Sequence, residues 1–218
     1  MSFEDQEEDK KIPNQTAYWA NQKTYELGID HPHRQLILDE LKKLEPFTKV
    51  LEVGCDIGQN LQRIHAVYPE VELSGYDIND TSIAKARKLL PKATFKIGKG
   101  LRWIPFAGKS DITIADAVLM YVGPKDIADV LRELVMVTKK AIIIVDWSSD
   151  DWKPGHPIRD GYSYVRDYEK MFMDPDRTLE IRSGRKVEKV EKIKITKDIW
   201  PTSEKWQKYG HCFIVHLQ

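Results

Sequence analysis

The sequence predicts a doubly wound α/β sheet that is mostly parallel and carries an antiparallel strand near its C-terminal end. Three observations predict it. Short apolar strands alternate with helical patterns over residues 33–146, a glycine-bearing turn joins the first strand to its helix, and strand-like sequence returns within residues 187–217. Such alternation of strands and helices is typical of a parallel sheet that is covered by helices on both faces.

The predicted elements follow one another without repeats or low-complexity sequence. Strands are expected at 49–53, 71–77, 94–97, 111–115, 141–145, 187–196 and 211–217. Helices are expected at 36–44, 61–68, 80–90 and 124–137, where apolar residues recur at helical spacing, and a short helix is expected at 164–172. Residues 141–145 are almost entirely apolar, as expected of a central strand that is buried on both faces.

Length and charge bound the class of protein. The chain has 218 residues, which fits a single domain over 13–218 after a disordered polar tail at 1–12. Lys+Arg and Asp+Glu each number 34, so the net charge of zero does not favour nucleic acid or a membrane as partner. The N-terminus lacks the apolar region of a signal peptide, and we expect a cytoplasmic protein with Cys55 and Cys212 as reduced thiols.

The most informative segment is VLEVGCDIGQNL at residues 50–61, where glycines separate a strand from a helix. Glycine lets the backbone approach a ligand closely. Asp77 ends the next strand, nineteen positions after Gly58. A carboxylate at that place binds ribose hydroxyls in Rossmann-like folds, so the pattern predicts a site for an adenosine-containing cofactor.

Charge separates the candidate cofactors. Glu52 and Asp56 lie at this turn, where they would repel the pyrophosphate of a dinucleotide. The spacing is G-x-x-x-G rather than G-x-G-x-x-G, and the Gly-Lys-Ser/Thr of a phosphate-binding P-loop is absent. S-adenosylmethionine (SAM) has no phosphate and carries a cationic sulfonium and an ammonium group, which carboxylates attract. The acidic turn therefore favours SAM.

Several segments resemble the class I SAM-dependent methyltransferases. LEVGCDIG at 51–58 resembles motif I of that family, and GYDIN at 75–79 is similar to its second motif. IPF at 104–106, SDITIA at 110–115 and the loop at 116–122 extend the resemblance, which covers roughly residues 33–146. The run from motif I through residues 166–168 also resembles methylases associated with pseudaminic acid biosynthesis, which implies a sugar or sugar-nucleotide acceptor.

Two residues depart from the family's pattern. Asp56 stands where the family usually has the middle glycine of motif I, and aspartate tolerates positive φ better than most residues. Lys99, between two glycines, stands where the family often has an acid that accepts the adenine amino group, and a lysine cannot accept a hydrogen bond. Adenine recognition is therefore expected to use backbone groups or another side chain.

The resemblance implies SAM as cofactor, S-adenosylhomocysteine (SAH) as product, and a set of binding residues. The residues expected to bind the cofactor are Glu52, Gly54, Cys55, Asp56, Gly58, Asn60, Asp77, Ile78, Lys99, Gly100, Leu101, Asp116, Ala117 and Tyr121. The residues expected to bind the acceptor are Tyr121, Trp147, His156 and Arg159, the last three in a lid-like insertion around 147–172. That insertion follows the carboxyl end of the fifth strand, where ligands bind in open α/β sheets.

Some acceptors must also lose a proton, and His33, His156 and Asp146 are candidate bases by residue type and expected location. No metal site is predicted, because His31 and His33 have no cysteine or acidic cluster beside them in the sequence.

Three functions are compatible with these patterns. Methyl transfer to a small molecule is the leading one, because the net charge is zero and the Asn-Pro-Pro-Tyr motif of amino-directed methyltransferases is absent at 116–119. An RNA or protein methyltransferase would need a basic surface joining the pocket to residues 182–197, which hold seven basic and two acidic residues. A non-catalytic SAM-binding or scaffold protein would result if Asp56 and Lys99 had closed the pocket.

Overall fold

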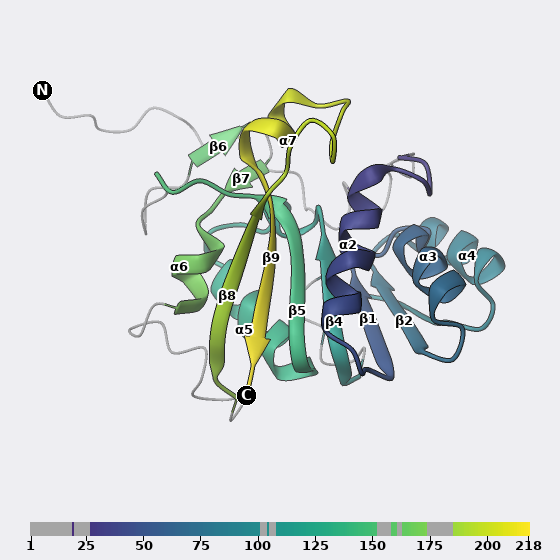
Figure 1. The fold of residues 1–218 in the computed structure, drawn as a ribbon. Helices are drawn as coiled ribbons and strands as arrows, with labels where there is room; N and C mark the ends of the chain where they lie inside the picture. Colours follow the sequence, from purple (N-terminus) through teal and green to yellow (C-terminus); the bar gives the residue numbers. More distant parts are fainter. Residues whose placement is uncertain are drawn as a thin grey trace, which may run out of the picture.

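A seven-stranded sheet organises the computed structural model, with strand order β3-β2-β1-β4-β5-β9-β8 (Figure 1). The strands are β1 (Lys49–Val53), β2 (Glu72–Asp77), β3 (Thr94–Ile97), β4 (Ser110–Asp116), β5 (Thr138–Trp147), β8 (Val187–Lys194) and β9 (Gly210–Leu217). Strands β1 to β5 are parallel, whereas β9 runs antiparallel to both β5 and β8. The predicted mostly parallel sheet with an antiparallel C-terminal strand is confirmed.

The structure describes Trp19 and Ile104 together with residues 27–100, 108–151, 158–160, 163–173 and 185–218. The predicted tail at 1–12 lies outside these residues. The longer helices are α2 (Pro32–Lys43), α3 (Gln59–Val67), α4 (Asp80–Leu89) and α5 (Ile127–Val137), and α6 (Tyr168–Met173) is a short helix. No helix among the described residues is long and apolar enough to span a membrane.

Two apolar cores lie on opposite faces of the sheet. Ile143 of β5 belongs to the core beneath α2, α3 and α4, whereas Ile142 and Ile144 belong to the core beneath α5 and α6. All three isoleucines are fully buried, as a strand covered by helices on both faces requires. This arrangement confirms the prediction of a central buried strand at 141–145.

The C-terminal third differs from the prediction. A hairpin of β6 (Ile158–Asp160) and β7 (Ser163–Val165) and a short helix α7 (Glu204–Tyr209) were not predicted. The helix expected at 164–172 begins only at Tyr168, because the residues before it pair in the hairpin. A six-residue helix such as α7 is too short to show a helical period, although Ser203 caps it by accepting a hydrogen bond from the Trp206 amide.

The strand order reverses direction at β1, which has β2 on one side and β4 on the other. A crevice forms beyond the carboxyl ends of the strands at such a switch point, because the flanking connections leave toward opposite sides. Helix α7 and the β6–β7 hairpin gather at this same end of the sheet (Figure 1). The fold therefore places a candidate site between the β1, β2 and β4 turns and the C-terminal segments.

Candidate active site

A cavity of about 610 Å³ opens beyond the carboxyl ends of β1, β2, β4 and β5. This volume lies in the range of roughly 300–1,000 Å³ that is usual for small-molecule sites. Most of the residues predicted from the sequence line it. They are His33, Glu52, Gly54, Cys55, Asp56, Asn60, Asp77, Ile78, Lys99, Gly100, Asp116, Ala117, Tyr121 and Trp147.

Other predicted residues do not line the cavity or cannot be placed. Gly58 is not a lining residue; it has φ 76° at the start of α3, and an added Cβ would lie 3.2 Å from the Phe95 ring. Its role is therefore conformational. Leu101 and His156 lie outside the described residues, and Arg159 lies in β6, where the structure describes the backbone alone.

The turn after β1 combines three left-handed residues, namely Gly54 at φ 73°, Asp56 at φ 46° and Gly58 at φ 76°. Asp56 thus adopts the positive φ that its place in the motif required. Its carboxylate accepts a 2.6 Å hydrogen bond from the Ser82 hydroxyl, which helps to hold the strained backbone. The glycine-to-aspartate departure is therefore accommodated, and the cavity remains open beside it.

Gly54 is the glycine on which the shape of this turn depends most. An added Cβ would lie 2.6 Å from Cγ2 of Val118, in the loop after β4. We expect Gly54→Ala to cost about 1–2 kcal/mol through the left-handed backbone alone, with the clash adding to it. Thermal unfolding should show a lowered Tm and calorimetry a weakened affinity for SAM. Gly123→Ala is the matched control, since Gly123 also lines the cavity and a Cβ added there would meet no atom closer than 4.0 Å. Equal losses in both variants would contradict the prediction.

An acidic network occupies the inner end of the cavity. Asn60 donates from Nδ2 to Glu52 Oε1 at 2.6 Å and to Asp116 Oδ2 at 2.8 Å. Arg34 donates to Asn60 Oδ1 at 2.8 Å, and its Nη1 lies 3.7 Å from Asp116 Oδ2. The first turns of α2 and α3 thereby fix two carboxylates, one from β1 and one from β4, side by side.

Each of these carboxylates has one oxygen without a donor. Glu52 Oε2 and Asp116 Oδ1 are buried and accept no hydrogen bond from the described residues. Burial raises the pKa of Glu52 to about 8. Burial also acts to raise the pKa of Asp116, but His33, Arg34 and Asn60 outweigh it and lower that pKa. The pair is therefore suited to receive a cation, which would supply the missing donors.

His33 is fixed by the protein at both ring nitrogens. Its Nε2 donates to Asp116 Oδ2 at 2.9 Å, and its Nδ1 lies 2.5 Å from Nδ1 of His31. Burial lowers the pKa of His31 to about 4, so His31 is neutral and can share only one proton with His33 across that contact. His33 thus orients Asp116 and has no nitrogen left for a substrate, which counts against the predicted role as a base.

Asp146, another predicted base, is fully buried and does not line the cavity. Its two oxygens accept hydrogen bonds from the backbone amides of Met120 (3.0 Å) and Trp147 (2.7 Å). Arg166 donates from the other side to the carbonyls of Leu119 and Val122. The two residues therefore hold the short 3-10 helix η2 (Leu119–Tyr121) in place, and Asp146 is a structural residue rather than a base.

Asp77 ends β2 at the wall of the cavity. Its Oδ2 accepts a hydrogen bond from the Asp56 amide at 2.8 Å, and its Oδ1 accepts one from the Asn79 amide at 2.9 Å. Burial raises the pKa of Asp77, and these amides oppose the rise. Each oxygen keeps further acceptor capacity, so the carboxylate is oriented and can still accept two hydroxyl donors.

The loop after β3 is set by Tyr76. Its hydroxyl donates to the Gly100 carbonyl at 2.8 Å, and it leaves no room for a side chain at Gly98, where an added Cβ would lie 2.1 Å from the phenol. Gly100 and Lys99 both line the cavity. The substitution of Lys99 for the family's acid therefore leaves this part of the cavity open, bounded by backbone groups.

The outer end of the cavity is aromatic, and most of its residues were missed from the sequence. Trp200, Ser203, Lys205 and Trp206 line it from the segment that carries α7. The Trp200 ring stacks on the Trp206 ring at 3.9 Å and on the His33 ring at 4.4 Å. The two tryptophans could have indicated a binding surface, but in the sequence they lie far from every cofactor motif. On the other side, the Trp19 ring lies 4.4 Å from that of Tyr121.

The fold defines an α/β protein with a cavity at its switch point, and comparison with known proteins shows which class it is similar to. Residues 50–141 match the family model described as a methyltransferase domain. The fold of the described chain is that of the class I SAM-dependent methyltransferases, whose cofactor is SAM. The resemblance seen in the motifs is thereby confirmed; the link to pseudaminic acid biosynthesis remains a prediction.

Two curated proteins show local similarity. They are trans-aconitate 2-methyltransferases from Variovorax paradoxus (28% identical over 74 residues) and from Delftia acidovorans (32% over 76 residues). Each alignment covers 34% of this chain, and the chain spans less than a third of their length, 29% and 28% respectively.

Solved structures of methyltransferases match more of the chain. A SAM-dependent methyltransferase from Leishmania major has a TM-score of 0.64 at 15% identity, covering 93% of this chain and 81% of that one. An amino pentose methyltransferase from Micromonospora echinaspora, with bound SAM, has a TM-score of 0.61 at 13% identity, covering 92% and 95%. Magnesium protoporphyrin IX methyltransferase from Synechocystis, with bound SAH, has 0.58 at 14%, covering 93% and 95%. At these identities the likeness concerns the fold.

Proposed function

We propose that the protein transfers a methyl group from SAM to a small-molecule acceptor bound at the aromatic end of the cavity. The observation that carries the proposal is the pair of buried oxygens, Glu52 Oε2 and Asp116 Oδ1, that lack donors at the inner end of the cavity. A buried carboxyl oxygen without a hydrogen-bond partner is costly, and a ligand ammonium would satisfy both oxygens once Glu52 gives up its proton.

The remaining lining residues fit the rest of the cofactor. Asp77 would accept the ribose hydroxyls, because its carboxylate is held in a fixed orientation by two backbone amides. The backbone of Gly54 and Cys55 would pass close to the ligand, and Gly100 with Lys99 would bound the adenine. Recognition of the adenine amino group would then use backbone carbonyls, since Lys99 offers no acceptor.

SAM supplies an activated methyl group, so the chain mainly has to align the acceptor and exclude water. Asp146 and Arg166 contribute by holding Met120 and Tyr121 against the cavity. The indole rings of Trp147, Trp200 and Trp206 line the aromatic end of the cavity and would exclude water from it. His33 contributes by holding Asp116, and we assign no base.

The acceptor class follows from the size and the lining of the cavity. A cavity of about 610 Å³ with an aromatic end suits a small molecule better than a polymer. Small molecules are also the acceptors named for the trans-aconitate and amino pentose methyltransferases that this chain resembles. An acceptor panel should therefore include organic acids and the sugars and sugar nucleotides that the motif resemblance implied.

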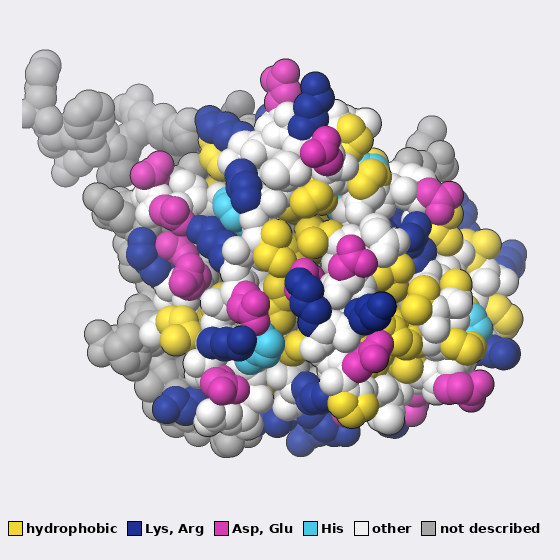
Figure 2. All heavy atoms as spheres, in the orientation of Figure 1, with side chains coloured by type: hydrophobic (Ala, Val, Ile, Leu, Met, Phe, Trp, Pro, Cys, Tyr) yellow, Lys and Arg dark blue, Asp and Glu magenta, His cyan; other side chains and the backbone are white. Residues whose placement is uncertain are grey.

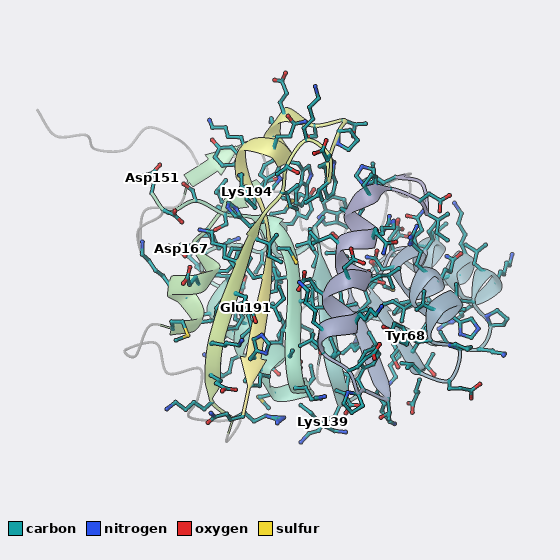
Figure 3. The ribbon with its side chains drawn as sticks, in the orientation of Figure 1. Tyr68, Lys139, Asp151, Asp167, Glu191 and Lys194 are labelled. Atoms are coloured by element: carbon teal, nitrogen blue, oxygen red, sulfur yellow. The ribbon has the colours of Figure 1, made fainter. Side chains whose placement is uncertain are left out.

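The RNA or protein alternative receives no support from strand β8, which holds much of the basic 182–197 segment. Lys189 pairs with Glu191 at 2.9 Å, Lys192 pairs with Asp150, and Lys194 donates to the Lys208 carbonyl. Side chains of both signs are interspersed over this face of the molecule (Figure 2), and Glu191 lies on the same strand as Lys194 (Figure 3). The described part of the segment therefore forms no continuous basic track.

The first test is calorimetric titration of the protein with SAM and SAH. We expect micromolar affinity, and we expect Asp77→Ala to weaken it at least tenfold, since a hydrogen bond to a charged group is worth about 1.5–3 kcal/mol. Asp80→Ala is the matched control, because Asp80 is exposed in the first turn of α4. A folded protein that binds neither ligand, or an Asp77→Ala variant that binds as tightly as the parent, would refute the proposed cofactor site.

A further inference from the structure

The aromatic end of the cavity carries features that the cofactor does not use. Trp200 and Trp206 lie parallel, 5° apart in plane, and Trp147 meets Trp206 edge-on at 6.1 Å and 73°. All three are at least nine-tenths buried and line the cavity. Two of the three indoles are stacked face to face and the third stands across them, so β5 and the α7 segment give this end of the cavity a rigid, apolar lining that suits an apolar ligand body.

Trp147 also carries a buried donor without a partner. Its Nε1–H is buried and has no hydrogen-bond acceptor among the described residues, although the side chain lines the cavity. Buried indole N–H groups usually find an acceptor, so an unpartnered one at a cavity wall is a candidate contact for a ligand oxygen. An indole can only donate, so the ligand must supply an acceptor.

A cation lies beside this donor. Lys205 of α7 lines the cavity, and its Nζ is 5.9 Å from the centroid of the Trp147 ring. The acidic residues that line the inner end, Glu52, Asp77 and Asp116, come from β1, β2 and β4. Arg34, Lys99 and Asp126 also line the cavity, but the aromatic end is where a cation, Lys205, lies near the Trp147 N–H that lacks an acceptor.

We propose that the aromatic end is an acceptor subsite for a molecule with an apolar body and a carboxylate, whose oxygen accepts from Trp147 Nε1–H and pairs with Lys205. The inference rests on the proposed function, and it names the chemistry of the acceptor. A single lysine and a single neutral donor match the one negative charge of a carboxylate, whereas a phosphate would bring nearly two charges into a cavity that is already acidic.

The test uses ¹⁵N-labelled full-length protein, because each indole N–H gives its own NMR signal. The signal that disappears in Trp147→Phe is that of Trp147; phenylalanine keeps an aromatic ring and removes the donor. Benzoate is titrated into the protein with and without saturating SAH, beside the neutral analogue benzamide and the dianionic analogue phenyl phosphate. Lys205→Gln tests the cation, and Lys208→Gln is the matched control on the same helix, away from the cavity lining.

We expect benzoate to shift the Trp147 signal and benzamide to leave it nearly unchanged. Trp147→Phe and Lys205→Gln should each weaken benzoate binding about tenfold, and Lys208→Gln should not. A Trp147 signal that ignores benzoate, equal binding of benzamide, or an unaffected Lys205→Gln variant would overturn the proposal; tighter binding of phenyl phosphate would overturn the choice of carboxylate. Failure of SAH to bind refutes the proposed function separately, since the titration without SAH still reads the subsite.

Discussion

Binding of SAM is expected to release about one proton near neutral pH and to tighten as the pH rises toward 8. The proton comes from Glu52. Burial raises the pKa of this carboxyl to about 8, so it is mostly protonated in the unliganded protein at pH 7. A ligand ammonium against Glu52 Oε2 favours the charged form and returns the pKa toward its ordinary value. Below pH 8 the ligand must displace the proton, so affinity should rise by up to tenfold per pH unit.

The raised pKa of Glu52 also makes the stability of the unliganded protein depend on pH, and this dependence runs opposite to that of SAM affinity. Because the folded pKa of Glu52 lies above the ordinary value of 4.5, the folded state binds more protons than the unfolded state between these values. Its stability therefore falls as the pH rises from about 4.5 to about 8, and bound SAM should offset that loss. Asn60, Asp116, Arg34 and Asp56 are the groups that bear on this carboxyl.

Calorimetry in phosphate and in Tris at one pH measures the released proton, because the two buffers differ in ionisation enthalpy. Glu52→Gln should bind SAM with a much flatter pH profile and release less. Glu72→Gln is the matched control, because Glu72 is the exposed first residue of β2. Equal apparent enthalpies in the two buffers would contradict the role of Glu52.

Arg166→Met is expected to destabilise the protein by about 3–5 kcal/mol, the usual cost of removing one partner from a buried charged network. Arg166 is 3% exposed and donates to the Leu119 and Val122 carbonyls. It also lies near the buried Asp146: burial raises the pKa of that carboxyl to about 7, and the charge of Arg166 opposes the rise. Without it, the Val122 carbonyl loses the donor that Arg166 supplies, the Leu119 carbonyl keeps only the Val122 amide, and Asp146 loses a nearby positive charge. Since η2 carries Tyr121 to the cavity, acceptor binding should weaken as well.

Urea unfolding of the parent and the variants measures this loss. Arg166→Lys should recover only part of it, because an ammonium keeps the charge and cannot donate to both carbonyls in the forked geometry of a guanidinium. Arg132→Met is the matched control, since Arg132 forms only a partly exposed pair with Asp129 on α5, worth a few tenths of a kcal/mol. An Arg166→Met variant as stable as Arg132→Met would show that the network is not stabilising.

The sequence predicted well which residues line the inner end of the cavity, because that end is built from local patterns. The turn at 54–58, the acid at the end of β2 and the residue that ends β4 each sit at the end of a strand that a short apolar run reveals. Parallel strands bring those ends together whatever the intervening sequence does. Position in the chain was therefore enough to place Glu52, Asp77 and Asp116 in one site.

The aromatic end could not be predicted in this way. Trp200 and Lys205 reach the cavity through an irregular segment and a six-residue helix, which show no period. The candidate bases His33 and Asp146 illustrate a different limit. Residue type and position in α2 and β5 made them candidates, but the hydrogen-bond partners that occupy each side chain are supplied by tertiary structure.

The stacked column of His33, Trp200 and Trp206 has a consequence for the order in which the molecule is made. It joins the first turn of α2 to a segment that the ribosome adds 167 positions later, as the residue numbers 33 and 200 show. A growing chain that ends before residue 200 contains β1, β2 and β4, whose turns line the inner end of the cavity, and lacks Trp200 and Trp206 at its aromatic end. The stack on His33 can form only after residue 200 has been added, so the aromatic end of the cavity is completed later in synthesis than the strands that carry the inner end.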